Sequence, residues 1–203
     1  MELLLIRHAL PLRVEREDGK PADPPLSEAG KAQAERLAAW LADDEVHAVY
    51  ASPMARARET AAPLADALGV SARIDPGLVE IDHLSHTYVP MEELKAMDRD
   101  AWLELVRGGL YAGIDLDAFR DNVRQSIERI VASHSGERVA VVCHGGVINA
   151  WGGHVLGVRE PFFFFDAGYT SISRFLAASS GERSLVSLNE TSHLRGAGGR
   201  GAR

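Results

Sequence analysis

Two histidines and two arginines are the residues of this sequence best suited to chemistry on an anion. Arg7 and His8 follow directly on the apolar run LLLI, and a second histidine opens the tripeptide HGG at 144–146. A further arginine, Arg56, lies in the segment SPMARARETA at 52–61. A charged guanidinium is costly to bury without a partner, so we expect these side chains to emerge from the core at a surface that an anion visits.

The elements that must position these residues alternate between strands and helices. Short apolar runs predict buried strands, and apolar residues at helical spacing predict amphipathic helices between them. We predict strands over 2–6, 46–52, 71–75 and 138–143 and two more within 170–190, and helices over 26–42, 53–68 and about 119–131.

Cap and turn residues mark several boundaries of these elements. Ser27 is a predicted N-cap for the first helix, and Ser52 followed by Pro53 predicts an N-cap and a first-turn proline for the second. Gly181 predicts the turn between the last two strands. Residues 90–116 are less regular, because they combine a helical stretch with several glycines.

The alternation of elements predicts an α/β fold. Strands that alternate with helices form parallel βαβ units, and a closing hairpin adds an antiparallel edge. We therefore expect a single-domain three-layer α/β/α sandwich with a mostly parallel central sheet and an antiparallel edge. The domain is expected to span residues 1–190, and the Gly- and Arg-rich segment 191–203 to form a flexible tail.

This fold predicts where the reactive residues meet. In open α/β sheets, ligands bind beyond the carboxyl ends of the strands, and each histidine and arginine named above follows a predicted strand. The N-termini of the following helices add N–H donors and a dipole that favours an anion. The result is a small cationic pocket that suits phosphate better than a metal ion. Periodicity leaves open whether Arg56 or Arg58 faces this pocket.

Composition limits the class of protein. The chain has 203 residues, of which 46% are hydrophobic, and its formal net charge of −7 argues against nucleic acid or an anionic membrane as the main partner. Cys143 is the only cysteine, so the chain has no disulfide framework. No apolar run approaches the roughly 20 residues that span a bilayer, and the N-terminus does not resemble a signal peptide. We expect a cytoplasmic protein.

Two further patterns have simple interpretations. His83 and His86 lie beside Asp82 at a spacing that metal ligands use, but no third ligand motif accompanies them. The four phenylalanines at 162–165 are most simply core or interface residues. Neither a G-x-S-x-G elbow nor a Walker A motif occurs. We therefore predict neither a metal ion nor a cofactor.

The motifs, taken in order, resemble those of the histidine phosphatase superfamily, which includes the phosphoglycerate mutases. The family pattern is R-H-G near the N-terminus, then L-T-x-x-G, S-P-x-x-R-A-x-x-T-A and L-x-E, with H-G-G late in the chain. The resemblance runs from residue 1 to about 176, and it assigns the motif arginine to Arg56 rather than Arg58. The matching segments are RHA at 7–9, LSEAG at 26–30, SPMARARETA at 52–61, LVE at 78–80 and HGG at 144–146.

The resemblance implies a role for each matched residue. His8 corresponds to the nucleophile, a neutral imidazole that attacks phosphorus and forms a phosphohistidine, which water then hydrolyses. Glu80 corresponds to the general acid that protonates the leaving oxygen and later deprotonates the attacking water. Charge accumulates on the equatorial phosphoryl oxygens, and fixed positive charge around them makes a metal ion unnecessary. The groups implied to bind the phosphoryl group are Arg7, Arg56, His144 and Gly145.

Departures from the family pattern narrow the expected function. Ala9 replaces the motif glycine, and Pro11 and Val14 stand where many relatives have polar residues. After Glu80 the sequence IDHLSH lacks the Gly-x-x-Glu-Gly of many phosphatases and the Arg-x-Tyr of the mutases. Asp82 would repel the carboxylate of a phosphoglycerate, which favours hydrolysis over mutase chemistry.

The sequence therefore predicts a metal-independent phosphomonoesterase that acts on a small phosphorylated metabolite. The alternatives are a phosphoglycerate-type phosphomutase and a non-catalytic phosphate-binding regulatory module, and the presence of both a nucleophile and an acid argues against the module. Residues 83–118 match nothing specific, and we expect them to form a lid or insertion that determines the substrate. The sequence leaves open whether the protein forms a homodimer.

Overall fold

The apolar run at the N-terminus forms one of the two central strands of a six-stranded sheet. The computed structural model describes residues 1–106 and 113–195. In it, β1 (Glu2–Arg7) lies between β6 (Arg138–Cys143) and β7 (Ile172–Ala177). It pairs in parallel with β6 and antiparallel with β7, so the change from parallel to antiparallel pairing falls at this strand.

The outer strands complete the sheet on both sides. Next to β6 lie β3 (Ala48–Ala51) and then β4 (Ala72–Ile74), and both pairings are parallel. Next to β7 lies β8 (Arg183–Glu190), which pairs antiparallel with it. Gly181 has a φ of +109° in the connecting turn, a backbone conformation that glycine adopts without strain. The prediction of a mostly parallel sheet with an antiparallel edge is confirmed.

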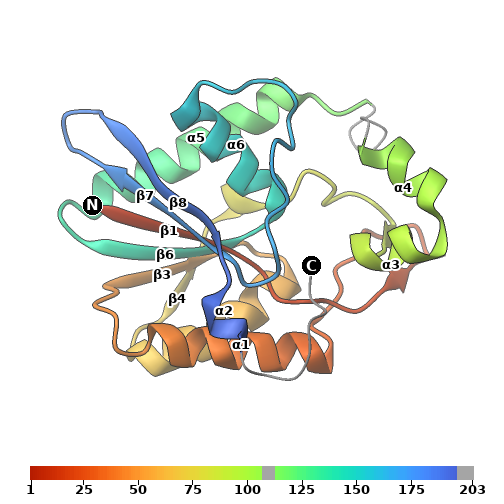
Figure 1. Ribbon diagram of the computed structural model, residues 1–203, viewed down its shortest axis with the longest axis horizontal. Coiled ribbons are helices and arrows are strands. Elements are labelled where there is room, and N and C mark those ends of the chain that lie inside the picture. The colour runs from red at the N-terminus through yellow and green to blue at the C-terminus, as the bar shows by residue number, and fades with distance from the viewer. Residues whose placement is uncertain (107–112, 196–203) are drawn as a thin grey trace.

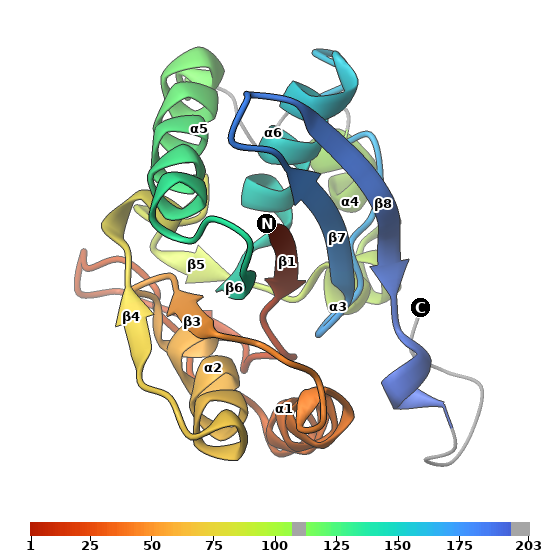
Figure 2. The same ribbon diagram turned by 90° about the vertical axis from the view of Figure 1, so that its left-hand side faces the viewer.

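Two pairs of helices cover the two faces of the sheet. One face packs against α1 (Glu28–Leu41) and α2 (Ala55–Leu68), and the other against α5 (Leu116–Ser133) and α6 (Gly145–Leu156). Figures 1 and 2 show these pairs on opposite sides of the strands. The structure thus confirms the predicted three-layer sandwich.

Alternate residues of β1 point into two separate cores. Leu3 and Leu5 belong to the cluster beneath α5 and α6, whereas Leu4 and Ile6 belong to the cluster beneath α1 and α2. All four side chains are fully buried, which is why the strand is a continuous apolar run rather than an alternating one. Each such side chain contributes about 1.5–3 kcal/mol by leaving water, so the position of the strand is strongly specified.

The predicted start of α2 is wrong by two residues. The sequence predicted Ser52 as N-cap and Pro53 as the first helical residue, but the N-cap is Met54. Ser52 remains bound to the sheet, because its backbone N–H donates to the carbonyl of Val142 at 3.0 Å. Its hydroxyl forms a hydrogen bond of 2.8 Å with Nε2 of His144 instead of capping the helix.

The start of α1 agrees with the prediction and shows why this helix contains a glycine. The hydroxyl of Ser27 accepts a hydrogen bond from the N–H of Gly30 at 3.0 Å and donates to the carbonyl of Leu10. This draws the helix onto the segment that follows β1. A Cβ at Gly30 would lie 2.0 Å from the carbonyl oxygen of Leu10, so glycine is required at this approach.

Several short elements lie beside the sandwich. β2 and β5 form an antiparallel two-stranded sheet that the sequence did not predict. The two helices α3 and α4 fall within the irregular segment 90–116, and residues 107–112 of that segment lie outside the described residues. Figure 1 shows α3 and α4 at one end of the molecule. The bounds are β2 Val14–Glu15, β5 Thr87–Tyr88, α3 Met91–Met97, α4 Arg99–Val106, and 3₁₀ turns at Pro76–Leu78 and Ser192–Leu194.

Three of the four consecutive phenylalanines at 162–165 pack in or against the core. Phe162 is 3% exposed, and Phe163 and Phe165 pack partly buried against the cluster beneath α5 and α6. The interpretation of these residues as core is confirmed.

The first residues of the predicted tail pack against the domain. His193 lies in the 3₁₀ turn Ser192–Leu194 and is buried, with its Nε2 2.9 Å from the hydroxyl of Thr170. Residues 196–203, which make up most of the predicted tail, lie outside the described residues. Within 1–106 and 113–195, no helix combines the length and the apolar character needed to cross a membrane.

Replacement of Gly30 by alanine is expected to destabilise the fold. Alanine normally stabilises a helix relative to glycine by about 1 kcal/mol, but here the added Cβ overlaps the carbonyl of Leu10. We expect Gly30→Ala to lower the free energy of unfolding by about 1–3 kcal/mol, measured by urea denaturation. Lys31→Ala, at an exposed position of the same helix, is the control, with an expected change within about 0.5 kcal/mol. A stabilised Gly30→Ala protein would contradict the described packing.

Candidate active site

The predicted site residues meet at one edge of the sheet. Because β6 lies between β1 and β3, the residues that follow these three strands are neighbours. The N–H of His8 donates to the carbonyl of Cys143 at 2.9 Å, and the N–H of Ser52 donates to the carbonyl of Val142 at 3.0 Å. The two histidine rings lie with their centroids 5.1 Å apart. The predicted convergence at the carboxyl ends of the strands is thus what the structure shows.

His8 is held as a neutral imidazole with one nitrogen directed into the site. Its Nδ1–H donates to the carbonyl of Ala9 at 2.8 Å, so the lone pair is on Nε2. Nε2 lies 3.3 Å from Nε of Arg56. Burial, together with the charges of Arg56 and Arg7, holds the pKa of His8 well below its usual range. The arrangement leaves Nε2 unprotonated, with its lone pair accepting the hydrogen bond from the Nε–H of Arg56 that an electrophile must displace.

His144 is the second buried imidazole of the site. It is completely buried as the N-cap residue of α6, and its Nε2 forms the hydrogen bond with Ser52 described above. Burial and the charge of Arg56 hold the pKa of His144 well below its usual range. In the described part of the chain, Nδ1 of His144 has no hydrogen-bond partner, so this atom is available to a ligand.

The guanidinium of Arg56 lies beside the nitrogen of His8. It is 1% exposed, whereas Arg58, two residues along the same helix, is exposed. Its Cζ lies 4.7 Å from the centre of the Tyr88 ring, and Nη2 lies 3.8 Å from Oδ1 of Asp82. Among the described residues, Nη1 and Nη2 of Arg56 have no hydrogen-bond partner. The structure places Arg56 in the site and Arg58 at the surface.

Arg7 contributes the second positive charge. Its Nη1 donates to the carbonyl of Ala167, and its Cζ lies 4.1 Å from the centre of the Tyr169 ring. Stacking of a guanidinium on an aromatic face restricts its orientation. The ring of Tyr169 also lies 5.8 Å from that of His8, so Tyr169 joins the second cation to the nucleophile.

Thr60 connects the segment of Arg56 to the segment of His8. Its hydroxyl accepts from the N–H of Ala9 at 2.9 Å and donates to the carbonyl of Arg56 at 2.7 Å. The sequence analysis quoted Thr60 within its motif but assigned it no role. Its position one helical turn after Arg56 is the signal that could have identified it.

Glu80 reaches the site across the N-terminus of α6. Its Oε2 accepts from the N–H of Gly146 at 3.0 Å, and Oε1 accepts from the N–H of Ile81 at 2.8 Å. A Cβ at Gly146 would lie 2.1 Å from Oε1 of Glu80, so the second glycine of HGG makes room for this carboxyl group. Burial and the nearby charge of Asp82 raise the pKa of Glu80 to about 7.

Asp82 is a second carboxyl group at the site. From the sequence it was a source of repulsion toward a carboxylate, a neighbour of the two histidines with metal-ligand spacing, and the next candidate for the acid after Glu80. Its side chain is 27% exposed. Burial raises its pKa, and the charge of Arg56 opposes this shift. Within the described ranges, its buried Oδ1 accepts no hydrogen bond, so its contact with Arg56 is electrostatic.

Two tyrosines that the sequence analysis missed enclose the arginines. Tyr88, in β5, stacks on Arg56, and Tyr169 stacks on Arg7. Their side chains are hydrogen-bonded to each other. No local sequence pattern identifies this pair, because the two residues come from distant segments.

The histidines considered as metal ligands have other partners. Nδ1 of His83 donates to the carbonyl of Glu80 at 2.8 Å, and Nδ1 of His86 to that of Lys20 at 3.1 Å. Over residues 1–106 and 113–195, no group of three or more His, Cys, Asp or Glu side chains is arranged to hold a metal ion.

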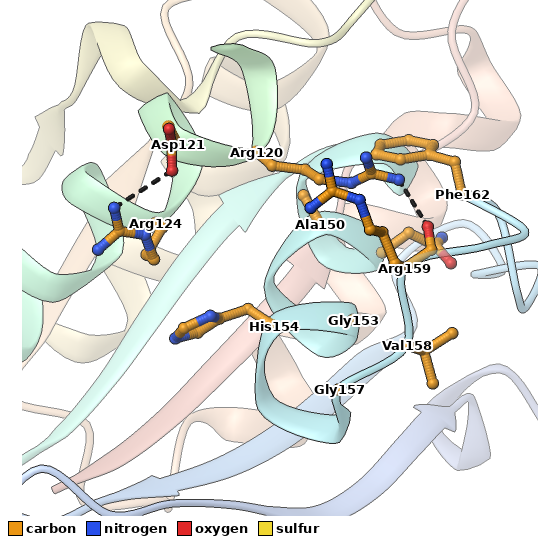
Figure 3. Close-up of a pocket in the computed structure, with 11 residues that line it drawn as sticks. Arg120, Asp121, Arg124, Ala150, Gly153, His154, Gly157, Val158, Arg159 and Phe162 are labelled. Atoms are coloured by element: carbon orange, nitrogen blue, oxygen red, sulfur yellow. Dashed lines mark hydrogen bonds and ion pairs between the residues drawn. The ribbon is translucent and has the colours of Figure 1, made fainter. Parts of the chain in front are cut away.

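A hollow of about 300 Å³ lies between α5 and α6, and neither His8 nor His144 lines it (Figure 3). Three arginines line it, and each is already paired with a carboxylate. Arg120 and Arg159 pair with Asp117, and Arg124 pairs with Asp121. The positive charge of this hollow is therefore largely neutralised, unlike that of Arg56.

The described groups together form a site for a tetrahedral anion beside a nucleophilic nitrogen. Arg7 and Arg56 supply charge, and the first turn of α6, beginning at Gly145, supplies backbone N–H groups. The carboxyl group of Glu80, with its raised pKa, is suited to give and take a proton near neutral pH. Such a site can transfer a phosphoryl group to His8.

Comparison with known proteins agrees with this chemistry. The family model of the histidine phosphatase superfamily (branch 1) matches residues 3–191. Phosphoserine phosphatase 1 of Hydrogenobacter thermophilus is 29% identical over 206 residues, which cover 96% of this chain and 94% of the relative. Phosphoglycerate mutase-like protein 4 of Arabidopsis thaliana is 30% identical over 160 residues, which cover 73% of this chain and 68% of the relative.

Solved structures share the fold. Bacillus stearothermophilus YhfR superposes with a TM-score of 0.78 at 24% identity, over 96% of this chain and 99% of that protein. The mycobacterial glucosyl-3-phosphoglycerate phosphatase Rv2419c, in a complex with VO3, gives a TM-score of 0.75 at 23% identity, over 94% of this chain and 99% of that protein.

The raised pKa of Glu80 is expected to depend on Asp82. A neighbouring anion disfavours ionisation of Glu80, so removal of the charge in Asp82→Asn should lower the pKa of Glu80 from about 7 toward its ordinary value of 4.5. The measurement is a titration of the Glu80 side-chain carbon by ¹³C NMR. Asp66→Asn, at an exposed position of α2, should leave that titration unchanged. A Glu80 that titrates near 4.5 in the unmodified protein would contradict the described environment.

Proposed function

Because this chain belongs to branch 1 of the histidine phosphatase superfamily and is a phosphomonoesterase of that class, we propose that it hydrolyses a small phosphorylated metabolite through a phosphohistidine on His8, without a metal ion. The observation that carries the proposal is the orientation of His8. Its Nδ1–H is bound to the carbonyl of Ala9, which leaves Nε2 facing the guanidinium of Arg56.

Phosphoryl binding is assigned to the cationic and hydrogen-bonding groups around His8. The Nη atoms of Arg56, which have no hydrogen-bond partner in the described ranges, and Nδ1 of His144 are available to phosphoryl oxygens. Arg7 adds a second positive charge, and the N–H of Gly145 adds a donor at the N-terminus of α6. Two guanidiniums balance the charge of a phosphate dianion, which supports a mechanism without a metal ion.

The first chemical step transfers the phosphoryl group to the enzyme. Nε2 of His8 forms a bond to phosphorus while the bond from phosphorus to the leaving oxygen breaks, and Glu80 donates its proton to that oxygen. In the second step a water molecule attacks phosphorus and gives its proton to Glu80. The bond between phosphorus and Nε2 breaks, which releases inorganic phosphate and restores both side chains.

The environment of Glu80 suits both steps. A carboxyl group with a pKa of about 7 is substantially protonated at neutral pH, when it must act as an acid. After transfer of the proton, the N–H groups of Gly146 and Ile81 stabilise its anion. Glu80 is therefore able to alternate between the two roles at one pH.

The segment 83–118 is proposed to determine the substrate. It contains β5, α3 and α4, which lie outside the sandwich, and Tyr88 of β5 stacks on Arg56. A small metabolite as substrate is supported by two of the proteins compared above, a phosphoserine phosphatase and a glucosyl-3-phosphoglycerate phosphatase, whose names state substrates of this kind. The catalytic domain is proposed to span residues 1–190.

A mutase is the second candidate, because one relative is a phosphoglycerate mutase-like protein. A mutase returns the phosphoryl group to a second hydroxyl of a phosphoglycerate, whose carboxylate must lie in the site. Asp82, beside Arg56, disfavours that carboxylate. Turnover that requires a bisphosphate primer would support the mutase, whereas release of inorganic phosphate without a primer supports the phosphatase.

Loss of the nucleophile is expected to abolish turnover. His8→Ala should release no phosphate from 4-nitrophenyl phosphate, and it should no longer form the acid-labile, base-stable phosphoenzyme that can be trapped with the unmodified protein. The assays are run in excess chelator, which should leave the unmodified enzyme active. His47→Ala is the matched control, because His47 is exposed and precedes β3, at the end of that strand opposite Ser52. Full activity of His8→Ala, or loss of activity in chelator, would overturn the proposed mechanism.

Removal of Arg56 is expected to impair the reaction far more than removal of Arg58. The two lie in the same helix, but only Arg56 is buried beside His8. We expect Arg56→Ala to lower kcat/KM by about 30-fold to 1,000-fold, which corresponds to roughly 2–4 kcal/mol of transition-state stabilisation, and to weaken inhibition by inorganic phosphate. Arg58→Ala should change either quantity by less than about threefold. Similar losses in both variants would show that Arg56 does not hold the phosphoryl group.

A further inference from the structure

Asp82 is an acidic group that the proposed mechanism does not use. It belongs to the same short segment as Glu80, and the two carboxyl groups are close enough for the charge of Asp82 to raise the pKa of Glu80. Its Oδ1 lies 3.8 Å from Nη2 of Arg56. Oδ1 is buried, whereas 27% of the side chain as a whole is exposed, so the side chain of Asp82 extends from Arg56 to solvent.

The position of Asp82 relative to the reaction follows from the geometry of Arg56. One edge of the guanidinium faces the attacking nitrogen, since Nε lies 3.3 Å from Nε2 of His8. The Nη2 atom points toward Asp82. In an in-line transfer the leaving oxygen lies across phosphorus from the nucleophile, beside the proton donor Glu80. Asp82, a neighbour of Glu80, therefore lies on the side of the alcohol that leaves.

The charges of the site are balanced only if the alcohol carries a positive charge. A phosphate dianion is matched by Arg7 and Arg56, and the lowered pKa values of His8 and His144 keep both imidazoles neutral. Glu80 must be protonated when it acts as an acid. With the neighbouring His83 neutral, an ionised Asp82 then remains as one unmatched negative charge, because Arg56 is already matched by the phosphate. A positive charge on the alcohol restores neutrality, whereas a carboxylate there adds a second negative charge.

We propose that Asp82 selects phosphomonoesters whose alcohol carries a positive charge, such as an ammonium group, over those whose alcohol carries a carboxylate. The inference rests on the proposed phosphatase function and specifies the class of its substrate. It makes Asp82 a specificity-determining residue that contacts the alcohol, while Glu80 performs the proton transfer.

An alternative role for Asp82 is to orient Arg56. At 3.8 Å the contact is longer than a hydrogen bond, and in the described residues Oδ1 of Asp82 and both Nη atoms of Arg56 have no hydrogen-bond partner. A positioning role would affect every phosphomonoester equally, because each presents the same phosphoryl group to Arg56. A selective role depends on the charge of the alcohol, so the two can be separated.

The test compares three substrates that differ in charge at the end of a two-carbon alcohol. They are O-phosphoethanolamine, with an ammonium group, ethyl phosphate, with no charge, and 2-phosphoglycolate, with a carboxylate. The quantity measured is kcat/KM for each substrate in the unmodified protein and in Asp82→Asn, at one pH near neutrality. Each substrate is compared with itself in the two proteins, so intrinsic leaving-group reactivity cancels. Ethyl phosphate reports any general change through Glu80 or Arg56.

The expected result is a change of opposite sign for the two charged substrates. After division by the change seen with ethyl phosphate, kcat/KM of Asp82→Asn should fall about tenfold or more with O-phosphoethanolamine and rise about tenfold or more with 2-phosphoglycolate. Changes of this size are expected for unit charges several ångströms apart in a partly buried site. Asp66→Asn removes an exposed carboxylate from α2 and should change none of these ratios. Asp82→Ser provides a second neutral side chain if Asp82→Asn folds poorly.

Two results would overturn the inference while leaving the phosphatase intact. One is an equal change for all three substrates in Asp82→Asn, which would show that Asp82 acts only through Arg56 or Glu80. The other is a preference of the unmodified protein for 2-phosphoglycolate over ethyl phosphate. Absence of turnover with all three substrates and with 4-nitrophenyl phosphate would instead overturn the proposed function, and the selectivity with it.

Discussion

The buried positive charge of Arg56 is the constraint on which the rest of the site depends. The guanidinium of Arg56 is 1% exposed, and in the described residues two of its nitrogens have no hydrogen-bond partner. A buried charge of this kind lowers the stability of the folded protein. The nearby Asp82 and the ring of Tyr88 compensate only in part. In the function proposed above, an arriving phosphoryl group supplies the missing acceptors beside His8.

The same charge determines which protonation states its neighbours adopt. Arg56 adds to the effect of burial on His8 and His144, and both imidazoles therefore stay neutral. Neutrality is what a nucleophilic nitrogen requires. Glu80 is shifted in the opposite sense, because burial and Asp82 outweigh the effect of Arg56 and of two backbone donors. Nucleophile and acid are thus prepared by one set of charges, and a change at Arg56 affects both.

Two glycines let the elements approach closely enough to build this arrangement. Gly30 allows α1 to rest on the carbonyl of Leu10, just beyond His8, and Gly146 allows the carboxyl group of Glu80 to reach the N-terminus of α6. A Cβ would collide at either place, at 2.0 Å and 2.1 Å respectively. These contacts give a physical reason for glycine in both motifs, where the sequence shows only a spacing.

The sequence by itself determined the layers of the fold and the strand ends that carry Arg7, His8 and His144. Elements buried on one or both faces show this in the spacing of their apolar residues along the chain. Glu80 was found only through its motif, since a carboxylate after a short turn has no periodicity of its own. Arg56 was likewise distinguished from Arg58 only through its motif, and the structure agrees, because Arg56 is buried and Arg58 is exposed. Tertiary structure alone decided that Ser52 binds His144 instead of capping α2, and that Tyr88 and Tyr169 enclose the arginines. Such contacts join segments far apart in the chain, so their energies depend on packing that no local pattern records.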